Sequence, residues 1–149
     1  MIKKISDKRK VKMDAYRDMK KKKKEFMIER KYYKCIFCGS QLDPEDDENI
    51  GFHHLTGRDN ELLTEWDNIE PAHNACHSDF HHRSVEQLLK TKWYSHFCER
   101  LKSHSTNNRF KREAYNTELR RQQKAEVIDH EMYLKMYLTE ERNKDGKHR

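Results

Sequence analysis

The fold is decided by residues 50–82, which read IGFHHLTGRDNELLTEWDNIEPAHNACHSDFHH. This His-rich segment holds six of the chain's ten histidines. Neutral imidazole is the commonest ligand of transition metals and also a natural general base near neutral pH. Histidine at this density is rarely a packing choice, so the chemistry of the chain is expected in this segment.

Composition limits the size of the hydrophobic core. The chain has 149 residues, of which 34% are hydrophobic and 39% are charged. This length suits one domain, and the composition predicts a small packed centre that carries long solvated helices and is helped by a bound metal. No stretch approaches the roughly 20 apolar residues of a membrane span, and no apolar signal segment follows the lysine-rich start. We therefore expect a cytoplasmic protein with reduced cysteines and no membrane partner.

Charge divides the chain into a basic helix at residues 1–34, a His-rich core at 35–83 and a helical region at 84–149. Residues 1–34 carry 15 Lys or Arg against 5 Asp or Glu, whereas residues 35–83 carry 2 against 11. The basic segment includes five consecutive lysines, which suit contact with a polyanion, although a solvated helix face is the alternative. The candidate contacts to nucleic-acid phosphates are Lys20, Lys21, Lys22, Lys23, Lys24, Arg58 and Arg83.

Local patterns predict an α+β fold. No Gly or Pro falls between Ser6, a candidate N-cap, and Lys31, which predicts one long helix. Residues 50–55 have the content of a short strand, residues 68–72 could return beside it, and a helix should span residues 73–82. A capping box at Ser84 should open another helix, and a linker at 103–108 should precede a charged helix to about Arg142. The predicted core stripe of the helix after Ser84 is Val85, Leu88, Leu89, Trp93, Phe97 and Leu101.

Spacing within the His-rich segment separates metal ligands from a base. In a helix, His77 and His81 stand four residues apart on one face, so both could coordinate one metal ion. In a strand, His53 and His54 point to opposite faces, so one of them is left for a second task. With His53 as the third ligand, a three-imidazole site keeps open positions for water and a phosphate oxygen, which is typical of a catalytic metal.

These residues resemble the HNH, or ββα-metal, nuclease family. The His53-His54 start and the final H-x3-H are similar to the form found in colicin-type DNases, and the resemblance covers residues 35–82. It implies that His54 is the general base that activates water, and that Asn68 fixes the ββ turn and orients His54. It also implies that His53, His77 and His81 hold a metal that binds the scissile phosphate and stabilises the leaving 3′ oxygen.

Two positions depart from the usual family pattern. Many members place Asp where His53 stands, and an all-imidazole set shifts the preference from Mg²⁺ towards Zn²⁺, Ni²⁺, Co²⁺ or Mn²⁺, so the catalytic divalent metal stays open. His73 stands where a second CxxC pair usually has Cys, but Cys3His is still a competent tetrahedral zinc set. The predicted ligands of a structural zinc are therefore Cys35, Cys38, His73 and Cys76, with Cys98 or His82 as alternatives to His73.

The combined expectation is a zinc-supported ββα-metal core, flanked by long helices, that hydrolyses phosphodiester bonds in DNA, foremost double-stranded DNA. Two alternatives stand beside this HNH endonuclease: a non-catalytic zinc-dependent nucleic-acid-binding module, and a zinc-stabilised structural or assembly protein. A homodimer through the terminal helices is left open. By analogy, the small size and lysine-rich composition favour a phage or mobile-element protein, acting in a bacterial or phage-infected cell.

Overall fold

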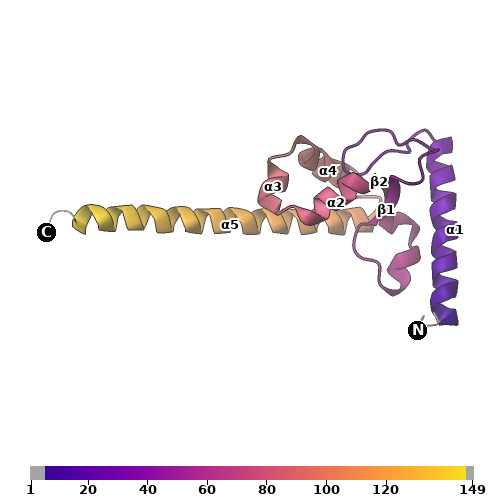
Figure 1. The fold of residues 1–149 in the computed structure, drawn as a ribbon, viewed down its shortest axis with the longest axis horizontal. Coiled ribbons are helices and arrows are strands. Elements are labelled where there is room, and N and C mark those ends of the chain that lie inside the picture. The colour runs from indigo at the N-terminus through magenta and orange to yellow at the C-terminus, as the bar shows by residue number, and fades with distance from the viewer. Residues whose placement is uncertain (1–5, 147–149) are drawn as a thin grey trace.

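The computed structural model describes residues 6–146, with side chains as far as residue 138. Helices surround one two-stranded antiparallel sheet, so the protein is α+β, as predicted. In Figure 1, α1 stands across one end of a small central body, and α5 runs along that body and extends far beyond its other end. The elements, in which η1 and η2 are short 3-10 helices, are α1 (Asp7–Glu29), β1 (Ile50–His54), η1 (Asn60–Thr64), η2 (Trp66–Asn68), β2 (Ile69–His73), α2 (Asn74–His82), α3 (Val85–Leu89), α4 (Lys92–Ser103) and α5 (Arg109–Gly146).

Helix α1 begins where the sequence predicts. The Ser6 hydroxyl accepts a hydrogen bond from the backbone N–H of Arg9 at 3.4 Å, which satisfies one of the free donors of the first turn. The helix ends just before Lys31, whose φ of 60° lies in the left-handed region and turns the chain away. Tyr16, Lys23 and Met27 share one face of α1 and are buried, so this face closes over the segment that joins the two strands.

The two strands pair in a register that fixes the direction of both adjacent histidines. His53 lies opposite Glu70, and His54 lies opposite Ile69. Because side chains alternate across a strand, His53 points to the face covered by α2 and is buried, while His54 points to the face covered by α1. The sheet therefore separates the two imidazoles, as the spacing predicts.

The cysteine knuckle, residues 35–41, attaches to the outer edge of the sheet. The backbone N–H of Cys35 donates to the Ser40 carbonyl at 2.9 Å, and Gly39 adopts a φ of 75°, which favours glycine. The N–H of Ile36 then donates to the carbonyl of Pro71 in β2 at 3.0 Å. This bond holds the knuckle beside the junction of β2 with α2.

One predicted helix proves to be two. The capping box at Ser84 is present, but α3 ends after one short turn and α4 starts at Lys92, with Thr91 in an extended conformation between them. Consecutive residues of a helix point in different directions, and in α3 Leu88 is fully buried while Leu89 is 49% exposed. The prediction that Leu89 belongs to the core is therefore wrong.

Phe37 is the centre of the hydrophobic core. Its ring is fully buried and lies 4.9 Å from the ring of Phe80 and 5.0 Å from the rings of Phe97 and His53, between centroids. It thus joins the cysteine knuckle to α2, α4 and β1. The core is small, in keeping with the polar composition, and one aromatic side chain connects most of its elements.

The first half of α5 packs on α3 and α4, and the second half leaves the body. Ala114, Glu118 and Ala125 are buried, whereas residues 126–138 are all exposed. Within residues 6–146, no helix has both the length and the apolar character needed to cross a membrane. The packed half of α5 borders the cleft described below.

Replacing Leu88 and Leu89 separately by alanine tests which side of α3 is buried. Leu88→Ala removes a fully buried side chain and should lower the free energy of unfolding by about 2–5 kcal/mol. Leu89→Ala trims an exposed side chain and should change it by less than about 0.5 kcal/mol. Urea unfolding followed by circular dichroism measures both, and equal losses would mean that both leucines are buried.

Candidate metal centres and active-site cleft

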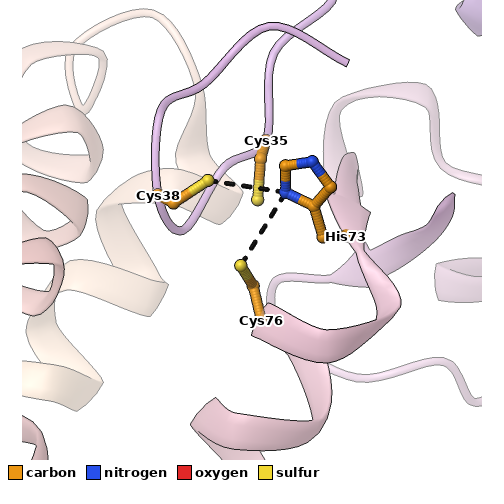
Figure 2. Close-up of side chains that lie close together, drawn as sticks. All are labelled: Cys35, Cys38, His73 and Cys76. Carbon is orange, nitrogen blue, oxygen red and sulfur yellow. Dashed lines mark hydrogen bonds between the residues drawn. The ribbon is translucent and has the colours of Figure 1, made fainter. Parts of the chain in front are cut away.

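Four predicted zinc ligands converge at the junction of the cysteine knuckle with the β2–α2 corner. The knuckle supplies Cys35 and Cys38, the end of β2 supplies His73, and the first turn of α2 supplies Cys76, as Figure 2 shows. One ligand atom from each lies within 4.8 Å of all the others. His73 Nδ1 is 3.4 Å from the Cys38 sulfur and 3.8 Å from the Cys76 sulfur. This Cys3His cluster could hold a metal such as zinc.

The thiol chemistry of the cluster fits a cation. Burial and the neighbouring charges of Cys35 and Cys38 raise the pKa of Cys76 to about 12, because several thiolates at this separation repel one another. Burial alone would also raise the pKa of Cys38, but hydrogen bonds with Ser40, Cys35 and His73 lower it to about 6. A divalent ion would remove the repulsion, since thiolates are its natural ligands.

Arg100 in α4 supports the knuckle and was not predicted. Its Nε and Nη2 donate to the Ile36 carbonyl at 3.1 and 2.7 Å, and Nη2 also donates to the Phe37 carbonyl. The guanidinium lies so close to Gly39 that a Cβ at that position would be 2.9 Å from Nη1. A positive charge here offsets the excess negative charge that three thiolates would place on a zinc site.

The imidazole triad, His53, His77 and His81, is a second candidate metal site. His77 Nε2 is 3.1 Å from His53 Nδ1 and 2.9 Å from His81 Nε2. Burial lowers the pKa of all three residues, and for His53 it does so to about 3, with further lowering by the charges of His77 and His81. The rings are therefore neutral near pH 7, which is the protonation state that binds metal.

His54 lies outside the triad and is oriented by the protein backbone. Its Nε2 is 3.3 Å from the Leu63 carbonyl, and its ring is 5.3 Å from the Tyr16 ring in α1. A carbonyl oxygen only accepts, so Nε2 carries the proton and Nδ1 keeps its lone pair. Burial lowers the pKa of His54, and the charges of Arg58 and Lys20 act in the same direction. A neutral, fixed imidazole of this kind can accept a proton.

Asn68 ties the loop between the strands to the start of β2. Its side chain is fully buried, and its Oδ1 accepts from the N–H and the hydroxyl of Thr56, both at 3.0 Å. Its Nδ2 donates to the carbonyls of Gly57 at 2.8 Å and Leu62 at 3.0 Å. The bond to Leu62 fixes the residue beside Leu63, so Asn68 positions the carbonyl that holds His54 rather than contacting His54 itself.

An open cleft of about 390 Å³ lies beside the imidazole triad and His54. One wall consists of His53 and His54 from β1 and His81 from α2. The other wall comes from α5, through Thr117, Glu118 and Arg121. Sequence reasoning placed α5 outside the site, because the helix lies far along the chain and carries no metal-binding pattern.

Two of the predicted phosphate contacts lie beside His54. Lys20 Nζ is 4.3 Å from the centroid of the Tyr16 ring, and the Arg58 guanidinium carbon is 6.0 Å from it. Because the Tyr16 ring in turn contacts the His54 ring, both cations border the face that carries His54. These two are the best placed of the predicted set.

The remaining surface cations of the set lie in more ordinary settings. Lys21 and Lys22 are exposed on α1, and Lys24 forms an ion pair of 2.7 Å with Asp47. Arg83 pairs with Asp79 one turn earlier. Exposed cations of this kind contribute to a basic surface without marking a particular binding position.

Lys23 is buried, so the prediction that it contacts phosphate is wrong. The residue is 5% exposed, and its ammonium donates to the carbonyls of Trp66 and Ile69. It also lies 3.9 Å from Glu70, which pairs with Lys111 at 3.2 Å. The helical spacing of Lys23 with Tyr16 and Met27 is the signal that could have revealed its inward direction.

Comparison with known proteins returned no relative. No protein-family model, curated protein or solved structure gives a significant match to the chain.

Metal substitution distinguishes the cluster cysteines from the remaining one. Cobalt bound by Cys35, Cys38, His73 and Cys76 should show strong thiolate-to-metal absorption, and Cys76→Ser should weaken this band and lower the thermal unfolding midpoint. The matched control is Cys98→Ser, because Cys98 contacts Gln122 instead and burial raises its pKa to about 11. An unchanged spectrum for Cys76→Ser, or a lost band for Cys98→Ser, would contradict the assigned ligand set.

The imidazole triad should keep its affinity for Ni²⁺ to a lower pH than free imidazole does. Protons compete with the metal for the ring nitrogens, and burial places the pKa of His53, His77 and His81 below the ordinary 6.5. Affinity should thus be constant above about pH 6.5 and fall only at lower pH. Calorimetric titrations between about pH 5 and pH 8, with His77→Ala as the control, measure the profile. A decline that starts above pH 6.5 would show that the rings are not buried as described.

Proposed function

We propose that the chain is a metal-dependent endonuclease of the HNH, or ββα-metal, type that hydrolyses phosphodiester bonds in DNA. One observation carries the proposal: a triad of neutral imidazoles, two of which line a cleft, lies beside His54, a separately oriented imidazole that lines the same cleft. A structural metal site has no use for the additional histidine, whereas hydrolysis needs both a Lewis acid and a base. The ββα arrangement of β1, β2 and α2 supports the same assignment.

In this proposal, His54 is the general base. Its Nδ1 accepts a proton from water as the water oxygen forms a bond to phosphorus, and the bond from phosphorus to the 3′ oxygen breaks. The Leu63 carbonyl, held in place next to the Asn68 contact at Leu62, keeps the His54 ring from rotating and favours the imidazolium that forms. His53, His77 and His81 would hold the divalent ion, which when bound supplies a positive charge for the phosphate and the leaving 3′ oxygen.

The ligand set bears on which ion is used. Three imidazoles favour Zn²⁺, Ni²⁺, Co²⁺ or Mn²⁺ over Mg²⁺, which prefers oxygen ligands. The Cys3His cluster would take a structural Zn²⁺ and connect the cysteine knuckle to α2, which also carries His77 and His81. The two sites thus have different chemistry, thiolate-rich for structure and imidazole-only for catalysis.

Plasmid cleavage by wild type and His54→Ala tests the proposal. Metal-stripped, zinc-reconstituted protein is incubated with supercoiled plasmid and Mg²⁺, Mn²⁺, Ni²⁺ or Zn²⁺. His54→Ala should lower the cleavage rate by about 10²–10⁴-fold, because a general base contributes that much, while DNA affinity in a gel shift stays nearly unchanged. The control is His130→Ala, since His130 is exposed on the distal part of α5.

The alternatives give different results in the same assay. A non-catalytic nucleic-acid-binding module would shift DNA in a salt-sensitive way but leave the plasmid supercoiled with every metal. A structural or assembly protein would do neither. Cleavage that survives His54→Ala would rule out the proposed base.

A further inference from the structure

The active-site cleft has a wall that the ββα unit does not supply. This wall is the packed half of α5, which brings the ion pair of Arg121 and Glu118 to the cleft beside the imidazole triad. The Arg121 side chain is 37% exposed, so it is accessible from the cleft without lying free in solvent. Its position raises the question of what the guanidinium does there.

Glu118 holds the guanidinium of Arg121, and Tyr94 in turn holds Glu118. Its Nη1 donates to both carboxylate oxygens of Glu118, at 3.0 and 3.1 Å. Glu118 is itself only 5% exposed and accepts a hydrogen bond of 2.5 Å from the Tyr94 hydroxyl in α4. The chain from Tyr94 through Glu118 to Arg121 therefore orients the guanidinium from inside the protein.

The ring of Phe80 aligns the guanidinium with the triad. The Arg121 guanidinium carbon is 5.6 Å from the centroid of the Phe80 ring. The same ring lies 5.3 Å from the ring of His81 and 5.8 Å from the ring of His53. Cation–π contact with Phe80 thus keeps Arg121 next to the imidazoles.

The hydrogen-bonding pattern leaves donors for a ligand. Among the described residues, the bonds from Arg121 leave from Nη1 alone, so Nε and Nη2 still have N–H groups. Two adjacent N–H groups of a guanidinium match two oxygens of a phosphate, and an arginine in such a site is already charged and oriented. A simple surface ion pair would need neither the buried Tyr94–Glu118 support nor a place beside the triad.

We propose that Arg121 binds the scissile phosphodiester with a fork of two N–H groups, so that α5 is part of the active site. This inference rests on the proposed nuclease function. Arg121 would bind two phosphate oxygens while the triad metal site faces the same group across the cleft. It would thereby supply two N–H donors that the residues of the sequence motif do not, while Glu118 balances its charge.

Two measurements on Arg121→Gln and Arg121→Lys test the inference. In the His54→Ala background, Arg121→Gln should reduce the slope of log K against log salt by about one phosphate contact, measured by fluorescence anisotropy with duplex DNA. In the wild-type background it should lower kcat/KM by about 10²–10³-fold, as expected for loss of a preorganised charge donor. Arg121→Lys keeps the charge but not the fork, so its kcat/KM should fall by about 10-fold or more.

The controls separate this inference from folding effects and from the proposed function. Arg112→Gln removes an exposed arginine near the start of the same helix and should leave kcat/KM unchanged. Thermal midpoints and zinc content verify that each variant is folded; if Arg121→Gln unfolds, Arg121→Lys decides alone. Either of two results would overturn the role of Arg121. One is that Arg121→Lys keeps the wild-type kcat/KM. The other is that Arg121→Gln has the same salt slope and the same kcat/KM as Arg112→Gln. No cleavage by wild type, together with a reduced salt slope for Arg121→Gln, would instead overturn the nuclease function and leave the phosphate contact standing.

Discussion

The antiparallel register of β1 with β2 is the constraint on which both candidate sites depend. One further backbone hydrogen bond fixes the pairing at each end. The Leu55 N–H donates to the Asn68 carbonyl, and the Asn74 N–H donates to the Asn49 carbonyl, each at 2.8 Å. A slip of one residue would exchange the faces of His53 and His54. The triad would then lose a ligand, and the imidazole oriented by Leu63 would turn towards α2. The buried Asn68 side chain bonds to Thr56 and Leu62 next to the start of β2. It thus helps to keep His53 and His54 on opposite faces of the sheet.

A small core makes the polar connections unusually important. Phe37 links the cysteine knuckle to the ring cluster of α2 and α4, but a two-stranded sheet gives few backbone bonds between segments. The knuckle is therefore also held through the Cys3His cluster and through the bonds of Arg100 to knuckle carbonyls. On the opposite side, the buried Lys23 serves the same purpose between α1 and β2. Buried charges are tolerated here because each has a partner.

Local sequence patterns predicted what depends on neighbouring residues. The strand with its two opposed histidines and the His77–His81 spacing depend on periods of 2 and 3.6 residues, whereas the Ser6 cap depends on a bond to the backbone of the first turn. The structure has all three. The structure also brings the four candidate zinc ligands together in one cluster and the three triad imidazoles together in another, as the spacing and the family resemblance predicted. Features that depend on tertiary contacts were missed. The break at Thr91 and the approach of α5 to the cleft arise from packing between elements that no local period encodes. The inward direction of Lys23 was missed as well, although its helical spacing with Tyr16 and Met27 carries the signal.

The negative charge of residues 35–83 explains why side chains from other parts of the chain also lie near the cleft. Residues 35–83, which hold both ligand sets, carry 11 acidic side chains against 2 basic ones, so this core by itself repels a polyanion. A divalent ion bound by three thiolates would leave the net charge of this core almost unchanged. A divalent ion bound by three neutral imidazoles would keep its full positive charge at the cleft. Cationic groups come from outside this core. Lys20 of α1 lies with Arg58 at the Tyr16 ring, near His54, and Arg121 of α5 lines the cleft, where it pairs with Glu118. In the proposed nuclease, the long helices are therefore not only a support for the ββα unit, because they supply side chains that would contact DNA phosphates.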